Sequence, residues 1–221
     1  DFRNYEKLAL EFDPGVNLIV GDNAQGKTNL LEAVSFLGSG KSFRHAREKD
    51  LIKADKNHAQ VSIAYVDSVR ENKMTYRMFR DLSKETFKNG IKIGRMSSFI
   101  GNFKAVLFCP EHLSIVKDEP AQRRTFLDSA ISQINRSYLS ALMEHKKLIE
   151  QRNALLKGYE KQKDSFAVTM EILSEKLAQD AAYITEVRAK YLTKLFSLVN
   201  GYLSEMTEGH EKAEFCYLSH I

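Results

Sequence analysis

The feature that most constrains this chain is a glycine-rich run that fits the phosphate-binding P-loop pattern. The run consists of Gly21, Asp22, Asn23, Ala24, Gln25, Gly26, Lys27 and Thr28. The apolar run 16–20 precedes it and predicts a buried strand, and residues 29–37 follow with apolar side chains at helical spacing. Strand, glycine loop and helix are the context that a P-loop requires, so the sequence predicts an α/β fold that binds a nucleotide.

The residue types in this run explain how it would hold phosphate. Gly21 and Gly26 allow backbone dihedrals that a side chain would forbid, so the loop N–H groups can surround phosphate oxygens. Lys27 would reach the β- and γ-phosphates, and Thr28 would offer its hydroxyl to Mg²⁺. We therefore expect residues 21–28, with Asn29 directly after them, to bind ATP and Mg²⁺.

The first half of the chain has the pattern of mixed α/β structure. Residues 8–12 alternate like a strand, and the alternating runs 60–66 and 74–79 predict a small antiparallel sheet with one face in water. Asn89-Gly90 predicts a hairpin turn after them. The short apolar run 105–109 is typical of a central strand.

The second half has few glycines and prolines and predicts three helices. We expect them at 120–132, at 137–157 with Gly158 as the stop, and over about forty residues on a stripe from 166 to 202. Two interpretations stay open, a helical-bundle subdomain and an antiparallel arm projecting from an ATPase head. The division that follows is a head lobe at 1–110, a helical insertion at 111–212 and a strand returning to the head at 213–221.

Composition limits the function only loosely. The net charge of +4 permits nucleic-acid binding without demonstrating it. The sequence shows no run of membrane-spanning length, no signal peptide and two cysteines in apolar runs, which favours a reduced, cytoplasmic setting. Because the chain starts at Asp1 and stops just after the strand-like run 214–218, we expect it to be a piece of a longer protein.

Several segments carry a family resemblance. Residues 1–5, followed by the P-loop, resemble the start of SMC-like ABC ATPases. Residues 110–116 leading into 120–128 resemble the signature of the RecF family, and the runs 40–44 and 151–157 are also similar. Two departures stand out: Asp118 replaces a usual glycine, and the sequence contains neither the ABC signature motif nor the Walker B acidic strand.

The resemblance implies an ABC-type ATPase head that acts as an ATP-gated clamp on DNA. Two heads would form a homodimer around ATP, bind double-stranded DNA near a gap, and help to load recombinase with RecR and RecO. It places Arg3 and Asn4 near the nucleotide phosphates, although a solvated N-terminal turn is an equal interpretation of these two residues. It also puts Glu111 at the position of the Q-loop, where other ABC ATPases have glutamine.

A basic run follows the expected first helix and is the candidate contact with DNA. Lys41, Arg44 and Arg47 would bind backbone phosphates without reading the sequence. A solvated loop is the alternative. Further on, Arg123 and Arg124 would brace the helices through carboxylates or touch nucleotide or DNA, and bracing is favoured.

Three functions from different classes remain. The leading one is an ATP-dependent DNA-binding protein of replication and recombinational repair. A P-loop kinase of a small molecule is the alternative, but it would need a compact lid with arginines, and this chain offers long helices instead. The third is a non-catalytic module in which ATP only stabilises the fold. Without a signature motif or Walker B strand, we expect this chain to bind ATP weakly and not to turn it over.

Overall fold

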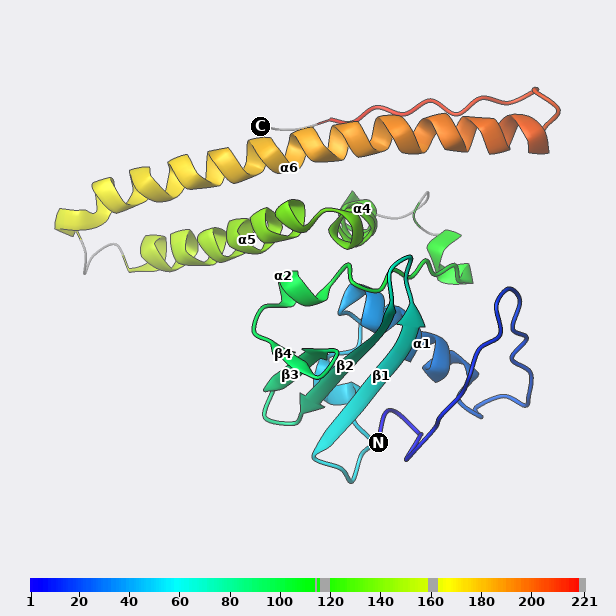
Figure 1. Cartoon of the computed structure of the whole chain (residues 1–221). Coiled ribbons are helices and arrows are strands. Elements are labelled where there is room, and N and C mark those ends of the chain that lie inside the picture. Colours follow the sequence, from blue (N-terminus) through cyan, green and yellow to red (C-terminus); the bar gives the residue numbers. More distant parts are fainter. Residues whose placement is uncertain (114, 116–119, 159–162, 219–221) are drawn as a thin grey trace. The chain divides into compact units, whose positions relative to one another are not determined.

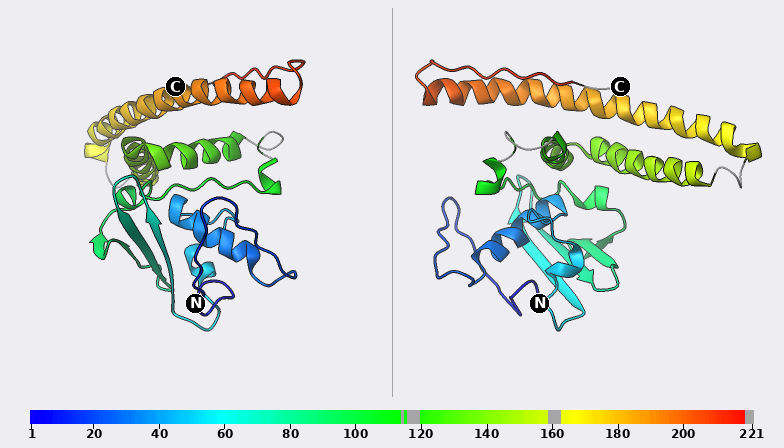
Figure 2. Two further views of the ribbon diagram at one scale, coloured as in Figure 1. Left: turned by 45° about the vertical axis from the view of Figure 1, so that its right-hand side comes forward. Right: turned by 180° about the vertical axis from the view of Figure 1, so that it is seen from behind.

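The computed structural model of the chain describes residues 1–113, 115, 120–158 and 163–218. These residues form two compact units, Asp1–Arg136 and Ser137–Ile221. Figures 1 and 2 show the elements of each unit. The N-terminal unit contains α1 (Lys27–Ser39), η1 (Glu48–Leu51), β1 (His58–Val66), β2 (Glu71–Phe79), β3 (Lys84–Lys88), β4 (Ile91–Ile93), α2 (Met96–Phe99), η2 (Pro110–Leu113) and α4 (Pro120–Ile134).

The predicted antiparallel sheet is confirmed. Its strands follow the order β1-β2-β3-β4, and Val61 lies opposite Tyr76 in the first pair. Side chains alternate between a buried and a more exposed face along β1 and β2, as the sequence pattern predicted. Asn89 and Gly90 both have positive φ, of 51° and 82°, which is the geometry of a tight hairpin turn between β3 and β4.

Helix α1 packs its apolar side against the buried face of the sheet. The rings of Phe36 and Tyr76 meet edge to face at 4.9 Å, and Tyr76 meets Phe99 of α2 at 5.7 Å. Phe2 joins this core and bridges to Ile52, so the first residues of the chain are tied to the body of the unit. The sheet therefore fixes both α1 and the N-terminal turn, the two segments that build the site described below.

Three strands predicted from apolar runs are absent, and this corrects the expected architecture. Residues 8–12, 16–20 and 105–109 form no strand in the described part of the chain, and Val16, Leu18 and Val106 are almost fully exposed. A strand exists only when a neighbour completes its hydrogen bonds, and none of the described segments pairs with these runs. Residues 8–22 instead form a long loop at the edge of the N-terminal unit (Figure 1).

The C-terminal unit consists of two long helices and an irregular tail. Helix α5 (Arg136–Lys157) matches the predicted second helix, and the N–H of Gly158 closes it by donating to the carbonyl of Ala154 at 3.0 Å. Helix α6 (Lys163–Met206) has 44 residues and continues through Gly201, which confirms the predicted length. No helix within the described residues is both long and apolar enough to cross a membrane.

Helices α5 and α6 run side by side in opposite directions within this unit (Figures 1 and 2). Arg188 of α6 donates from Nε to the hydroxyl of Tyr138 in α5 at 2.9 Å, and Tyr138 is fully buried. Leu148 and Leu155 of α5 and Ile184 of α6 are also buried. The middle of the predicted stripe, at Ile184, is therefore buried, whereas its last members Leu198 and Tyr202 are exposed.

The C-terminal segment differs from the predicted returning strand. Residues 213–218 are irregular, and residues 219–221 lie outside the described part. The side chain of Asn200 exchanges two hydrogen bonds with the backbone of Ala213, at 3.0 and 2.8 Å, and Phe215 stacks on Phe196 at 3.7 Å between ring centroids. The apolar side chain of Phe215 packs on α6 and not in a sheet.

The division into compact units places α4 with the N-terminal unit. The backbone N–H of Ala105 donates to the side chain of Gln133 at 2.8 Å, which ties α4 to the extended segment before it. Gly101 approaches the carbonyl of Gln133 so closely that an added Cβ would lie 2.7 Å from the oxygen. The boundary between the units therefore lies at Arg136, whereas the sequence suggested 110.

Candidate nucleotide-binding site

The P-loop enters α1 through a residue that must be glycine. Gly26 has φ of 106°, a conformation that side chains rarely adopt. An added Cβ would lie 2.6 Å from the hydroxyl oxygen of Tyr5 and 3.0 Å from Nδ2 of Asn4. Both the dihedral angle and the close approach of the N-terminal turn therefore exclude other residues. Gly21 also has positive φ, of 148°, as the sequence predicted.

The first turn of α1 offers an anion-binding end. Gly26 has no side chain with which to cap the free N–H groups, and the first bond of the helix runs from Leu30 N–H to its carbonyl at 3.0 Å. Such an N-terminus carries partial positive charge and suits a phosphate. Lys27 adds a full charge, and Thr28 lies exposed on the same turn.

Lys27 is folded back over the loop. Its Nζ donates to the carbonyls of Gly21 and Asp22, at 2.6 Å each, so the ammonium is held against the start of the loop. The remaining loop residues Asp22, Asn23, Ala24 and Gln25 are exposed. The ammonium of Lys27 and the N-terminus of α1 are both positive. These donors therefore fit the negatively charged phosphates of a nucleotide.

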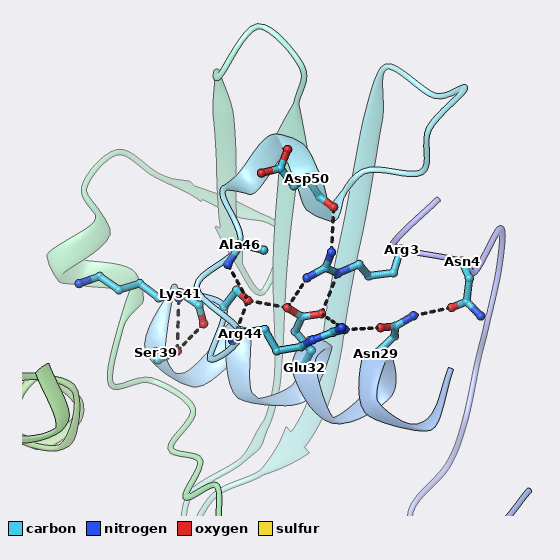
Figure 3. Close-up of polar contacts among 10 residues, drawn as sticks. Arg3, Asn4, Asn29, Glu32, Ser39, Lys41, Arg44, Ala46 and Asp50 are labelled. Carbon is cyan, nitrogen blue, oxygen red and sulfur yellow. Dashed lines mark hydrogen bonds and ion pairs between the residues drawn. The ribbon is translucent and has the colours of Figure 1, made fainter. Parts of the chain in front are cut away.

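Three polar side chains from separate segments meet beside this turn (Figure 3). Asn29 donates from Nδ2 to Oδ1 of Asn4 at 2.8 Å and accepts from the guanidinium of Arg44 at 3.1 Å. The structure thus joins two residues predicted to bind the nucleotide, Asn4 of the N-terminal turn and Asn29 of α1. It also brings in Arg44, which the sequence suggested as a DNA contact.

Glu32 lies at the centre of the same cluster, and its role was missed from the sequence. Its side chain is fully buried and receives Nε and a terminal nitrogen of Arg3 at 2.8 and 2.7 Å, a bidentate pair. Ser42 donates its hydroxyl to Glu32 at 2.5 Å, and Arg44 lies 3.8 Å away. The available signal was an acidic residue one turn before Phe36, on the side of the helix that enters the core.

The environment of Glu32 has opposing effects on its pKa. Burial alone favours the neutral acid, but hydrogen bonds from Arg3 and Ser42 and the charges of Arg3 and Arg44 outweigh it, so the pKa falls below its ordinary value of 4.5. A carboxyl group with a lowered folded-state pKa stabilises the fold above its unfolded pKa and loses that contribution as the pH falls through the folded value.

The pH dependence of unfolding tests this assignment. We expect the free energy of unfolding to fall as the pH drops below about 4.5, the ordinary pKa of Glu32. Urea titrations between about pH 7 and pH 3 would measure it. Glu32→Gln should flatten this acid limb, whereas Glu71→Gln, at an exposed position, should leave it as in the wild type. An acid limb of equal slope in Glu32→Gln would contradict the assignment.

The predicted DNA contacts lie in different surroundings. Lys41 is exposed, and in the part of the chain that the structure describes its ammonium makes no ion pair. Arg47 is 72% exposed and pairs with Asp50 at 3.0 Å, a surface contact of little strength. Arg44 is instead engaged with Asn29 and Glu32.

The last two predicted residues are Glu111 and Arg123. Glu111, the suggested Q-loop position, belongs to η2, but its side chain lies outside the described part of the structure. Arg123 donates to the carbonyl of Ile115 at 3.2 Å, a contact that braces α4 against the preceding segment. Groups of three or more acidic, cysteine or histidine side chains suited to a metal do not occur among the described residues.

Comparison with known proteins identifies the family. Residues 1–105 match the RecF/RecN/SMC N terminal domain. The whole chain aligns at 35% identity with the DNA replication and repair protein RecF of Clostridium acetobutylicum, and at 38% with that of Clostridium botulinum. In both cases the chain spans about 60% of the length of the curated relative.

Solved structures agree with the sequence comparison. A structure of the recombination mediator protein RecF with ATP, in the RecFOR pathway, matches 94% of this chain with a TM-score of 0.86 at 37% identity. A second RecF structure, described as RecF-ATPrS, gives the same TM-score at 38% identity, and the chain covers 56% of each. With its P-loop, its head-type fold and these relatives, the chain belongs to the RecF family of SMC-like ATPases.

Proposed function

We propose that this chain binds ATP through its P-loop and belongs to a protein that acts on DNA in replication and repair. The observation that carries the proposal is the site itself. An uncapped helix N-terminus, the folded Lys27 and the N-terminal turn with Asn4 converge at Gly26. The solved structures described as RecF-ATP and RecF-ATPrS support the choice of nucleotide. Titration calorimetry with ATP and Mg²⁺ tests it, and the absence of binding would refute it.

Different residues of the site would bind the phosphates and the Mg²⁺ ion. Lys27 would exchange its bonds to the carbonyls of Gly21 and Asp22 for bonds to the β- and γ-phosphates. Thr28 would contribute a hydroxyl ligand to Mg²⁺, whose other ligands are phosphate oxygens and water. Arg3 and Asn4 would border the site from the N-terminal turn.

We propose that the surface of the loop after α1 contacts DNA through Lys41 and Arg47. Neither side chain is held strongly: Lys41 is exposed and Arg47 has one surface pair. Contacts of this kind neutralise backbone phosphates and release counterions, so they make binding depend on salt. Arg44 is left out of this contact because its guanidinium already donates to Asn29 and lies 3.8 Å from Glu32.

Charge reversal at Lys41 and Arg47 tests the DNA contact. In the whole protein the double variant Lys41→Glu, Arg47→Glu should lower the slope of log affinity against log salt by about two, one for each lost phosphate contact. Fluorescence anisotropy with labelled duplex DNA at several salt concentrations measures it. Lys73→Glu, at an exposed position of β2, is the control. An unchanged slope in the double variant would show that this loop does not touch DNA.

The assembly proposed for the whole protein is an ATP-dependent homodimer on double-stranded or gapped DNA that helps to load recombinase with RecR and RecO. Helices α5 and α6, joined by Tyr138 and Arg188, would form its antiparallel arm. Sedimentation with and without ATP tests the dimer. If Lys27→Ala dimerised as readily as the wild type in ATP, ATP would not be what holds the heads together.

A further inference from the structure

We propose that Lys88, Asn102 and Arg136 form a binding site for one phosphate group of the DNA backbone, called here the Asn102 site. The three residues come from β3, from the segment after α2 and from the junction between α4 and α5, and they share no residue with the P-loop site. This inference rests on the proposed action of the protein on DNA. It adds a second contact, at a different place, to the one proposed for Lys41 and Arg47.

The side-chain amide of Asn102 is held in one orientation. Its Nδ2 donates to the carbonyls of Ser98 and Phe99, at 2.7 Å each, and its backbone carbonyl accepts from the hydroxyl of Tyr65 at 2.8 Å. Because the two carbonyls at α2 can only accept, the amide nitrogen must face them and Oδ1 must face the other way. Oδ1 is therefore a fixed acceptor that carries no formal charge.

Two cations converge on this one oxygen. Nζ of Lys88 donates to Oδ1 of Asn102 at 2.9 Å, and a terminal nitrogen of Arg136 donates to it at 3.2 Å. An amide oxygen accepts these bonds without neutralising either charge. Among the described residues, no carboxylate forms an ion pair with Lys88 or Arg136. Since both bonds end on one atom, the cations are close enough to repel each other, and an anion bound by both would relieve that repulsion.

Asp67 feels the charge of Lys88 but is bonded elsewhere. Its Oδ1 accepts the backbone N–H groups of Val69 and Arg70, at 2.9 Å each, and its Oδ2 accepts from Asn72 at 2.7 Å. The backbone bonds from Arg70 and Val69 contribute most to holding the pKa of Asp67 below its ordinary value, and Lys88 contributes less. Asp67 therefore stabilises its own turn and does not neutralise the Lys88 ammonium.

Core packing brings the two cations to Asn102. Lys88 lies opposite Met74 in the register of β2 and β3, so its half-buried side chain is on the face of the sheet that forms the core. Arg136 reaches Asn102 because Gly101 packs against the carbonyl of Gln133, three residues before Arg136. A lysine at the edge of a core usually has a charged partner, and a phosphate bound at the Asn102 site would supply it.

The Asn102 site is close to the loop that we expect to contact DNA. An added Cβ on Gly40, the residue before Lys41, would lie 3.1 Å from Met96 and 3.2 Å from Ile100. Asn102 follows Ile100 by two residues, at most about 7 Å along the backbone. Duplex DNA carries one phosphate charge per about 1.7 Å of its axis, so one duplex can contact Lys41 and the Asn102 site together.

The experiment is a salt titration of DNA binding by the whole protein. Fluorescence anisotropy with labelled duplex DNA gives the slope of log affinity against log salt for the double variant Lys88→Gln, Arg136→Gln. We expect this slope to fall by about one, the value for one lost phosphate contact. The control Lys73→Gln, Lys92→Gln removes the same charge at exposed positions of β2 and β4 and should keep the wild-type slope.

Asn102→Asp tests the same contact with both cations in place. The new carboxylate would neutralise the pair, so the slope should again fall by about one. Circular dichroism verifies that each variant folds, because this substitution also removes the two bonds from Nδ2 to the carbonyls at α2.

The outcomes separate this inference from the proposed function. If the wild-type protein does not bind duplex DNA, the proposed function fails, and this inference with it. If the wild type binds DNA and Lys88→Gln, Arg136→Gln keeps the wild-type slope, only this inference is overturned. A fall by about two would mean that the cations contact separate phosphates and would overturn the shared site. If Asn102→Asp does not fold, the double variant decides alone, and if the double variant does not fold, the exposed Arg136→Gln is measured under the same criteria.

Discussion

Replacing Lys27 by alanine should weaken ATP binding about a hundredfold. The Lys27 ammonium lies 2.6 Å from two loop carbonyls and carries the only full charge of the loop suited to phosphate. Removing it deletes charge-assisted bonds to the phosphates, and the free energy of unfolding should change little because the side chain is not buried. Titration calorimetry with ATP and Mg²⁺ measures the affinity.

A matched control separates this effect from loss of charge alone. Lys73→Ala removes the same charge from an exposed position of β2 and should bind ATP as the wild type does. If Lys27→Ala kept the wild-type affinity, the phosphates would bind elsewhere and the P-loop assignment would be wrong. Urea titration of both variants should give free energies of unfolding close to that of the wild type.

Gly26→Ala should cost about 1–3 kcal/mol of stability and abolish tight ATP binding as well. Gly26 has φ of 106°, where alanine is strained, and its new methyl group would lie 2.6 Å from the hydroxyl of Tyr5. Relief of this overlap must move either the N-terminal turn or the start of α1, and both border the phosphate site. Urea unfolding measures the first effect and nucleotide titration the second.

Gly94 provides the comparison for Gly26. It lacks the positive φ of Gly26, and an added Cβ would meet no atom within 4 Å. Gly94→Ala should therefore retain wild-type stability and nucleotide affinity. If Gly26→Ala behaved like Gly94→Ala, the close packing of Tyr5 on the P-loop would not be required for the site.

The sequence predicted the structure correctly where the hydrogen-bonding partner of a segment lies close to it in sequence. The antiparallel pairing of β1 with β2 and the turn at Asn89-Gly90 followed from alternation and local turn chemistry. Helix α5 ended where Gly158 predicted, and α6 ran the full length of its apolar stripe. These elements depend on hydrogen bonds within the segment or to a neighbour in sequence.

The same reasoning failed for apolar runs that pair with no strand in the described part of the chain. The runs 16–20 and 105–109 are apolar enough for buried strands, yet Val16 and Val106 are exposed. Composition indicates that a run would suit a sheet, but backbone pairing depends on a second strand that composition cannot supply. The segment 214–218 follows the same rule: its Phe215 found an aromatic partner on α6 instead.

The sequence by itself determined the phosphate loop, because Gly21, Gly26, Lys27 and Thr28 act within one turn of chain and their spacing defines the chemistry. Only the tertiary structure decided what surrounds it. Arg3 and Glu32 are 29 residues apart, and Ser42 and Arg44 arrive from a third segment. Nothing in their spacing predicts that they meet. Their contact depends on α1 packing against the sheet and on Phe2 anchoring the N-terminal turn, which together bury one carboxylate among cations beside the P-loop.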